Sequence, residues 1–383
     1  MGKSLRNISY QFSAPARLLF IFLLFFSLAS CSQPKEKAQP TGQSGDPIAN
    51  GGQTAKQSEG WKLPLKVPEG EFFKVFGWLS DSEIVFASNL SLGSNLYRYS
   101  LETGESDLIL MTENPIVTVS INPQKTRLMV HTSPSSYEAV VTIYDTNGNE
   151  LANQSFPSSE LHTEWNPYEV DDLLIVAFNE DWTYKAFRMN AADRKVEEIG
   201  IPNPFVKWIG KDKYAYLEWD EDNPTFFAPL VMQDIQGEKA TAPFGNLYHL
   251  ETYNNLILGI SAAGEEFDKA IFTFYDTRLS QLLSFELPQL GRFSGWLVPF
   301  MDFNDNKQEF TIFEPIKSGD ADSYTEGFIL SSHALGGGRK VLLEGAENQP
   351  IESSPNGEAF LYGYRFEKII DSVGKRVISL IQE

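Results

Sequence analysis

The sequence predicts an all-β protein, a single β-propeller built from four-stranded antiparallel blades. Three observations lead to this fold. From Trp61 onward the chain consists of short segments of alternating apolar and polar residues separated by turn residues. No stretch there has the 3.6-residue apolar period of a helix. A strand, a polar turn and a second strand recur along the chain with a period near 44 residues, which is typical of a propeller blade.

The recurring first hairpin occurs seven times. The centres of its turns are 41 to 44 residues apart for the first five copies and 51 residues apart for the last two. They lie near Asp81, Asn122, Asn166, Gly210, Asn254, Asp305 and Asn356. Seven copies predict seven blades, and we keep six as the alternative.

A second hairpin follows each of the first six, which gives four strands per repeat. Its turns lie at residues 101–105, 145–149, 190–194, 234–238, 276–280 and 334–339. The last repeat shows only three strands and ends in residues 375–381. Since residues 61–67 also have strand character, we expect that N-terminal strand to pair with the C-terminal strands. Such pairing would close the ring and remove an open sheet edge.

Residues 1–30 have the pattern of a bacterial lipoprotein signal peptide. Lys3, Arg6 and Arg17 form a positive region, and residues 18–28 form an apolar stretch that is too short to span a membrane. The stretch ends in Leu-Ala-Ser before Cys31, the single cysteine of the chain. We expect a diacylglycerol on Cys31, with palmitate among its acyl groups, cleavage before this residue, and attachment to the outer (extracytoplasmic) side of the cell membrane. The alternative is an ordinary secretory signal with an incidental cysteine, or a marginal signal anchor.

Residues 31–60 are expected to be a disordered tether, and residues 61–383 the propeller. The tether is rich in Pro, Gly, Gln, Ser and Lys and has almost no large apolar side chains, so it cannot bury enough surface to fold. As a flexible coil it would hold the propeller on the order of 30 Å from the bilayer.

Charge excludes one class of partner. After removal of the leader with its three basic residues, the chain has 28 basic and 51 acidic residues, a formal charge of −23. Such a surface repels phosphate backbones and anionic lipid headgroups, so we expect no nucleic-acid partner. Once Cys31 carries a lipid, no thiol remains for a disulfide.

The lipobox, the polar tether and the repeat region together resemble the YqgU-like propeller lipoproteins of Gram-positive bacteria. The resemblance implies a membrane-attached propeller. That family is described as six-bladed, which differs from the seven repeats counted in this chain. It has no established activity, so the resemblance implies no substrate.

The sequence offers little support for catalysis or for a bound cofactor or metal. The four histidines (His131, His162, His249 and His333) fall in different repeats, and none forms a short ligand pair. No Gly-x-Ser-x-Gly motif is present. Asp302, Asn304 and Asn306 resemble the start of a calcium loop, but Lys307 takes the place of the required glycine. We expect no cofactor and, with less support, no enzyme activity.

Acidic loops provide the candidate binding face. The loops between the second and third strands of four repeats are rich in carboxylates, with tryptophans among them, and in a propeller these loops share one face. The candidate residues are Asp181, Trp182, Trp219, Asp220, Glu221, Asp222, Glu265, Glu266, Asp320 and Asp322. The alternative is that an acidic chain places its carboxylates in loops simply because they are solvated there.

Three functions remain open, and the third, a folding or assembly factor for other exported proteins, shares all its sequence features with the first. The first is a non-catalytic, membrane-anchored binding or scaffold module that holds a protein or peptide partner on this acidic face. The second is a binder or hydrolase of cell-wall carbohydrate, because carboxylates beside aromatic rings also suit sugars.

Overall fold

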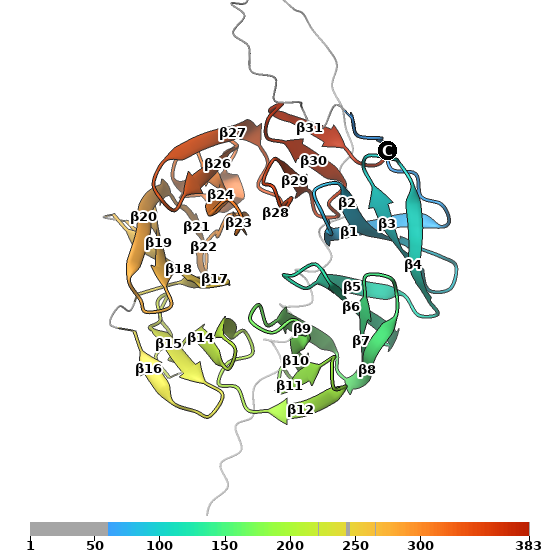
Figure 1. Cartoon of the computed structure of the whole chain (residues 1–383). Helices are drawn as coiled ribbons and strands as arrows, with labels where there is room; N and C mark the ends of the chain where they lie inside the picture. Colours follow the sequence, from blue (N-terminus) through green and yellow to red (C-terminus); the bar gives the residue numbers. More distant parts are fainter. Residues whose placement is uncertain (1–59, 221, 243–245, 265, 383) are drawn as a thin grey trace, which may run out of the picture. The chain divides into compact units, whose positions relative to one another are not determined.

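The computed structural model describes residues 60–382, apart from residues 221, 243–245 and 265. Cys31, the signal peptide and residues 31–59 of the tether therefore lie outside the described residues, as do Glu221 and Glu265. The described chain forms seven four-stranded antiparallel sheets arranged in a ring (Figure 1). The all-β propeller is confirmed, and seven is the number of its blades.

The first four sheets follow one another along the chain. Sheet 1 contains β1 (Glu71–Trp78), β2 (Glu83–Asn89), β3 (Ser94–Ser100) and β4 (Ser106–Thr112). Sheet 2 contains β5 (Ile116–Ile121), β6 (Arg127–Ser135), β7 (Glu138–Asp145) and β8 (Glu150–Pro157). Sheet 3 contains β9 (Glu160–Trp165), β10 (Asp172–Phe178), β11 (Tyr184–Asn190) and β12 (Lys195–Ile199). Sheet 4 contains β13 (Lys207–Gly210), β14 (Lys213–Leu217), β15 (Leu230–Asp234) and β16 (Lys239–Thr241).

The last three sheets include one insertion. Sheet 5 contains β17 (His249–Tyr253), β18 (Leu256–Ala263), β19 (Lys269–Asp276) and β20 (Gln281–Pro288). Sheet 6 contains β23 (Met301–Asn304), β24 (Glu309–Pro315), β26 (Phe328–Ala334) and β27 (Arg339–Ala346). Sheet 7 contains β28 (Ile351–Ser353), β29 (Ala359–Tyr362), β30 (Lys368–Asp371) and β31 (Arg376–Ser379). A small extra sheet joins β21 (Leu290–Arg292), β22 (Gly295–Trp296) and β25 (Gly319–Asp320), and the 3-10 helix η2 (Ala321–Ser323) follows.

The hydrophobic core consists of seven clusters, one between each pair of neighbouring sheets. β2 shows how the sequence builds them, because its side chains alternate between two clusters. Ile84 and Phe86 pack toward sheet 7, whereas Val85 and Ala87 pack toward sheet 2. A strand buried on both faces needs an almost continuous apolar run, and Glu83–Asn89 provides one. Trp78, Trp165 and Trp208 each lie in one of these clusters, as expected from their recurrence in the first hairpins.

Closure of the ring differs in one detail from the expectation. The first and last sheets do meet and share a core cluster that includes Leu65, but residues 61–67 form no strand. Their contact with sheet 7 is a hydrogen bond from Leu65 N to Leu380 O, at 2.7 Å. Two causes explain the error: Lys368–Asp371 is a short strand that the sequence pattern concealed, and Pro64 has no N–H to donate to a ladder. All four strands of sheet 7 therefore come from one continuous segment.

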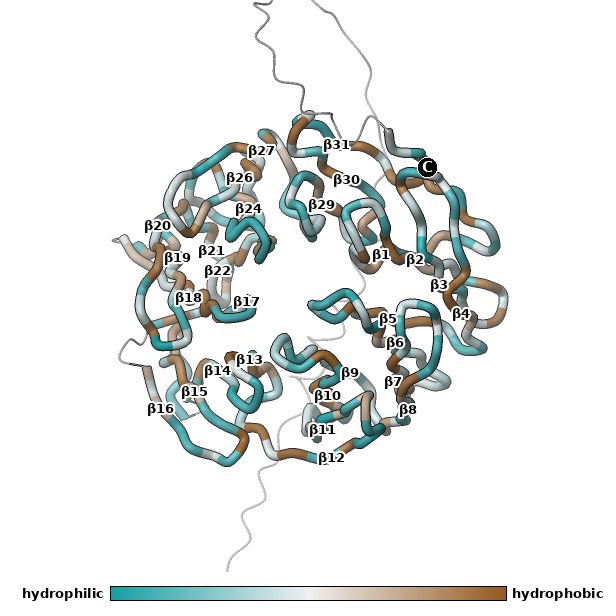
Figure 2. The backbone as a smooth tube through the Cα atoms, viewed as in Figure 1, coloured by the Kyte–Doolittle hydropathy of each residue, from teal (hydrophilic) through white to brown (hydrophobic). Residues whose placement is uncertain are grey.

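Antiparallel connectivity gives the ring two different faces. The loops between the second and third strands of each sheet lie at the same end as the connections between successive sheets. We call this end the loop face. The hairpins that join first to second and third to fourth strands lie at the other end. Hairpins near the centre of the ring are mainly hydrophilic, whereas the apolar residues lie on the strands (Figure 2).

Candidate functional site

Exposed aromatic side chains are concentrated on the loop face. Nine are exposed among the described residues: Tyr137, Trp182, Phe205, Trp219, Phe226, Phe267, Phe293, Phe300 and Tyr364. Each belongs either to a loop between second and third strands or to a connection between sheets. Exposed apolar residues elsewhere are aliphatic and scattered, for example Val170 and Val373 on the opposite face. A set of exposed rings confined to one face is typical of a binding surface.

The loop that carries Trp182 holds this ring in a constrained position. Trp182 is 69% exposed and has a φ of 65°, in the left-handed region that bulky residues rarely adopt. A turn fixes it: Trp182 N donates to Asn179 O at 3.0 Å, and the Asp181 carboxylate accepts from Thr183 N at 3.1 Å. Its ring lies edge-on to Phe178, with 6.0 Å between centroids. The turn thus presents a large apolar ring to solvent.

A second aromatic group gathers around Trp296, on the inserted strand β22. The ring centroids of Phe226, Phe227, Phe267 and Tyr248 lie 4.9 to 5.9 Å from that of Trp296. These residues come from the loops of sheets 4 and 5 and from the connection between them. The insertion therefore ties neighbouring loops together, while Phe226 and Phe267 remain about half exposed.

The acidic residues of the candidate face have two different roles. The described ones, like the two tryptophans, are all exposed on the loop face, as the loop positions require. Three of them shape their own turns: Asp181 accepts from Thr183, Asp220 from the backbone of Asp222 and Asn223, and Asp320 from the backbone of Asp322 and Ser323. The side-chain hydrogen bond from Thr183 lowers the pKa of Asp181, and one from Asn223 lowers the pKa of Asp220. Both shifts favour the charged form of Asp181 and Asp220.

Three other carboxylates are available for an external partner. Within the described residues, the side chains of Asp222, Glu266 and Asp322 make no hydrogen bond or ion pair. Glu218 and Glu326, by contrast, are paired with Lys239 at 3.1 Å and Lys317 at 2.5 Å. The loop face therefore combines exposed rings with free negative charge.

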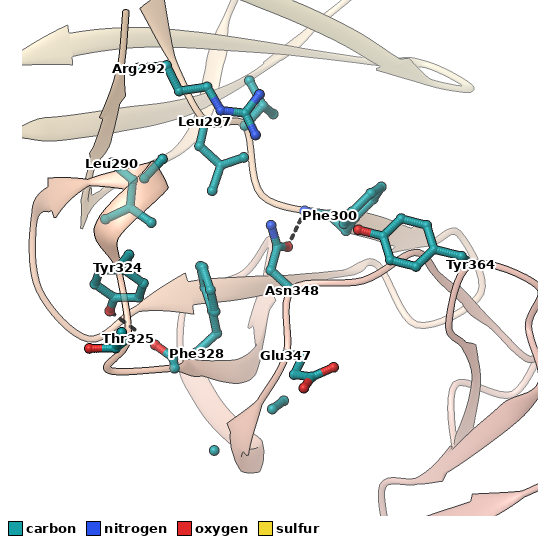
Figure 3. A pocket seen from close by; sticks show the side chains of 15 residues that line it. Leu290, Arg292, Leu297, Phe300, Tyr324, Thr325, Phe328, Glu347, Asn348 and Tyr364 are labelled. Atoms are coloured by element: carbon teal, nitrogen blue, oxygen red, sulfur yellow. Dashed lines mark hydrogen bonds between the residues drawn. The ribbon is translucent and has the colours of Figure 1, made fainter. Parts of the chain in front are cut away.

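A pocket opens on this face beside sheet 6, with a volume of about 590 Å³ (Figure 3). Its walls come from the inserted strands, from the loop around η2 and from the connection between sheets 6 and 7. Leu290 and Phe328 are buried beneath it. Phe300 and Tyr364 form an edge-to-face pair with 6.2 Å between centroids. The Tyr324 hydroxyl donates to Gly327 O at 3.0 Å and accepts from Ile316 N at 2.7 Å, so Tyr324 holds the loop rather than a ligand.

The innermost strand of each sheet contributes one residue to a ring about the axis, and six of these seven residues are polar and the seventh is a glycine (Figure 1). We call it the axial ring: Gly77, Ser120, Glu164, Lys207, Glu251, Asp302 and Glu352. Three of its carboxylates accept a backbone N–H from the next sheet: Glu164 from Trp208, Asp302 from Ser353 and Glu352 from Trp78. Glycine at position 77 leaves room for Glu352, since a Cβ there would lie 2.9 Å from its carboxylate. The axial ring thus connects neighbouring sheets.

Within the axial ring, Lys207 bridges two carboxylates. Its Nζ lies 3.3 Å from Glu164 and 2.8 Å from Glu251, beside a cavity of about 670 Å³. Burial raises the pKa of Glu164 to about 6, and burial also lowers the pKa values of His162 and His249 nearby. In the described part of the chain, no group of three His, Cys, Asp or Glu side chains is placed to hold a metal ion.

Replacing Lys207 by methionine is expected to destabilise the protein in a pH-dependent way. The variant leaves Glu164 and Glu251 facing each other without the cation, which should cost about 2–4 kcal/mol at pH 8. A carboxyl with a raised pKa in the folded state favours folding as the pH falls, so most of the loss should be recovered at pH 5. Urea unfolding at both pH values measures this, with Lys213→Met on the neighbouring strand as control. A loss independent of pH would contradict this account.

Comparison with known proteins agrees with this architecture. A model of the "YqgU-like 6-bladed beta propeller domain" matches residues 100–363, which is more than half of the chain. The chain belongs to the YqgU-like propeller family. The matched segment contains sheets 2 to 6 complete but only parts of sheets 1 and 7, so the family description and the seven sheets of this structure differ at the ends.

Individual relatives are similar over most of their length. The uncharacterised lipoprotein YqgU of Bacillus subtilis is 23% identical over 352 residues, which cover 92% of this chain and 93% of the relative. The crystal structure of an uncharacterised protein from Listeria monocytogenes matches with a TM-score of 0.75 and 23% identity, covering 82% of this chain and 96% of that one.

A more distant structure shares only the fold. The propeller domain of the Trilobed protease from Pyrococcus furiosus has a TM-score of 0.53 and 12% identity, covers 82% of this chain and 98% of that one, and is described as having an open Velcro topology.

Across the described part of the YqgU-like chain, no helix is long and apolar enough to cross a membrane.

Sequence reasoning found part of the loop face and missed the rest. It selected Trp182 and Trp219 because acidic residues surround them, but passed over Phe205, Phe293 and Tyr364, which do not lie in the four acidic loops. Their positions could have identified them as loop residues, because each comes after the end of a strand and directly follows Pro, Arg or Gly in the sequence. The axial ring was also missed, although each member lies a few residues before the centre of a first hairpin.

Proposed function

We propose that this chain is an extracytoplasmic, lipid-anchored binding module that holds a protein or peptide partner on its loop face without catalysing a reaction. The anchor is a diacylglycerol on Cys31. The lipobox that ends in Cys31 and the lipoprotein character of the Bacillus subtilis relative support this anchor. With the tether between anchor and ring, the loop face can reach partners near the membrane.

The observation that carries the proposal is the confinement of all nine exposed aromatic side chains of the described residues to the loop face. Contact of exposed Trp, Tyr and Phe rings with water is unfavourable, so a partner that covers them gains binding free energy. Trp and Tyr are also among the residues most often responsible for affinity in protein interfaces. Their distribution over several sheets indicates a broad contact surface.

Charge favours a basic partner over the membrane itself. Rings alone would also suit the lipid–water interface, where aromatic residues are common. The carboxylates interspersed with them, including the unpaired Asp222 and Glu266, repel anionic headgroups. A basic, partly apolar protein surface satisfies both the rings and the charges.

Two double variants test the proposal. Trp182→Ala with Trp219→Ala is expected to weaken partner binding about 30-fold, as loss of interface hot spots does. Asp222→Lys with Glu266→Lys is expected to slow association about tenfold at low salt and less at high salt. Binding is measured by quantitative crosslinked capture from native membranes, followed by kinetics with the captured partner once purified.

The control variants carry matched changes on the opposite face: Val170→Ala with Val373→Ala, and Glu102→Lys with Glu238→Lys. If these reduced capture as much as the loop-face variants do, the proposed face would be wrong. Equal binding of all variants to protein-free vesicles, with no protein captured, would indicate membrane docking. Release of the captured material by cell-wall fragments would favour the carbohydrate alternative.

A further inference from the structure

The pocket of Figure 3 brings together groups that sequence analysis did not connect. Arg292 is exposed at the end of β21, and among the described residues its guanidinium makes no hydrogen bond or ion pair. It lies beside Leu297, across the pocket from Glu347 (Figure 3). In a chain with 51 acidic and 31 basic residues, an arginine without a carboxylate partner is available for an external anion.

The remaining lining combines apolar surface with free hydrogen-bonding atoms. Leu290 and Phe328 form an apolar floor, and Phe300 and Tyr364 form an aromatic end. Asn348 Oδ1 accepts from Phe300 N at 2.8 Å, which fixes the side chain and leaves its Nδ2 group without a partner in the described residues. The Glu347 carboxylate accepts from Gln349 Nε2 at 2.7 Å through Oε2, and its Oε1 has no hydrogen bond within the described residues. An apolar floor beside this oxygen and the free amide group suits a peptide with apolar side chains, whose backbone needs donors and acceptors.

We infer that this pocket binds the carboxyl-terminal end of a peptide or protein chain: an apolar last side chain on the floor, its terminal carboxylate on Arg292. This inference rests on the proposed function and specifies which part of the partner is recognised. A basic partner suited to the acidic loops has few side-chain carboxylates near the contact, whereas every chain has a carboxylate at its end. Bidentate pairing with arginine is a strong and directional way to recognise that group.

The volume also fits this occupant. About 590 Å³ lies within the range of pockets for small ligands, so it can hold the last few residues of a chain but not a folded domain. A fatty acid has the same end group, but its acyl chain would leave Asn348 Nδ2 and the Glu347 side chain in contact with hydrocarbon, which is unfavourable.

Fluorescence anisotropy with defined peptides tests the inference. The probe is an eight-residue peptide with three lysines that ends in Leu-Phe, labelled at its amino end and made as the free acid and as the carboxy-amide. The protein is the full lipidated chain in nanodiscs of neutral lipid. We expect the acid to bind at least tenfold more tightly than the amide, since a charged hydrogen bond of this kind stabilises by about 1.4 kcal/mol or more.

Variants then assign the effect to the pocket. Arg292→Gln should reduce binding of the acid to the level of the amide and leave the amide unchanged. Tyr364→Ser, at an exposed position, should weaken both peptides about equally. Arg278→Gln, an exposed arginine in a turn on the opposite face, should change neither.

Three results would overturn the inference: equal affinity of acid and amide for the unaltered protein, no binding of either peptide, or displacement of the peptide by decanoate at lower concentration than by unlabelled peptide. These outcomes are separate from those of the proposed function. If Trp182 and Trp219 are needed for capture while Arg292 is not, the loop face binds its partner without recognising the partner's carboxyl-terminal end. If Arg292 distinguishes acid from amide while no native partner depends on the tryptophans, the proposed function fails.

Discussion

Replacing Glu314 by alanine is expected to lower the free energy of unfolding by about 3–5 kcal/mol, because it removes the hydrogen-bond acceptor of the buried His333 and Ser331 and the counter-ion of Arg339. Glu314 lies on β24 and is only 5% exposed. Its carboxylate accepts hydrogen bonds from His333 Nε2 at 2.7 Å, from Arg339 Nε at 3.0 Å and from the Ser331 hydroxyl. The His333 ring stacks on Phe285 of sheet 5 at 4.0 Å, so the group joins two sheets.

The same group predicts a pH dependence. Hydrogen bonds from His333 and Arg339 outweigh the opposing effect of burial and lower the pKa of Glu314 from 4.5 to about 2. A carboxyl whose pKa is lower in the folded state stabilises the fold above its unfolded pKa. That stabilisation, roughly 3 kcal/mol, is lost as the pH falls from about 4.5 to about 2.

Urea unfolding of the unaltered protein, Glu314→Ala and Glu314→Gln between pH 2 and pH 7 measures both effects. Glu314→Gln should lose less stability than Glu314→Ala at pH 7, since it keeps some hydrogen bonds. Its free energy of unfolding should also not show the decrease between pH 4.5 and pH 2 that titration of Glu314 causes in the unaltered protein. Glu344→Gln, on the exposed strand β27, is the control. A Glu314→Ala protein with unchanged stability at pH 7 would show that the buried group contributes nothing net.

The second large effect concerns Cys31. Replacing it by alanine is expected to abolish incorporation of labelled palmitate completely, because the thiol that we propose receives the diacylglycerol is gone. Cleavage before residue 31 should fail as well, so the chain should keep residues 1–30 and be larger by that segment in intact-mass measurement.

Ser32→Ala is the matched control and should be lipidated and cut normally. The two interpretations of the leader differ here. If Cys31→Ala is still cleaved near the same position, the segment is an ordinary secretory signal and the cysteine is incidental. If neither protein takes up palmitate, the proposed lipid anchor is wrong.

The repeat architecture was predictable because each first hairpin has a polar turn between two apolar runs, and that pattern recurs at a nearly constant interval. The third strand of sheet 7, β30, was not, since Lys368–Asp371 has four residues and begins with a lysine. Sheet membership of so short a segment depends on tertiary contacts, here the burial of Ile369 and Ile370 in two different core clusters. Periodicity in one sequence cannot show this.

The candidate site was predictable only in its topology. Loop positions placed Asp181, Trp219 and Asp322 on a common face because strand direction alternates. The hydrogen bonds that each carboxylate makes within its loop could not be predicted. Whether a carboxylate closes its own turn, as Asp220 does, or is free, as Asp222 is, depends on local backbone geometry. The pocket at Arg292 combines segments from residues 290 to 364, and no local pattern indicates that they meet.

The most direct test of the account is site-specific photo-crosslinking in living cells. A photoreactive phenylalanine is placed, one position at a time, at Tyr137, Trp182, Phe267 and Tyr364 on the loop face, and at Asn147, Asp193, Thr277 and Val373 on the opposite face. The account predicts adducts with a protein of one defined mass from several loop-face positions and none from the opposite face. Adducts that form equally from both faces, or only from the opposite face, would contradict it.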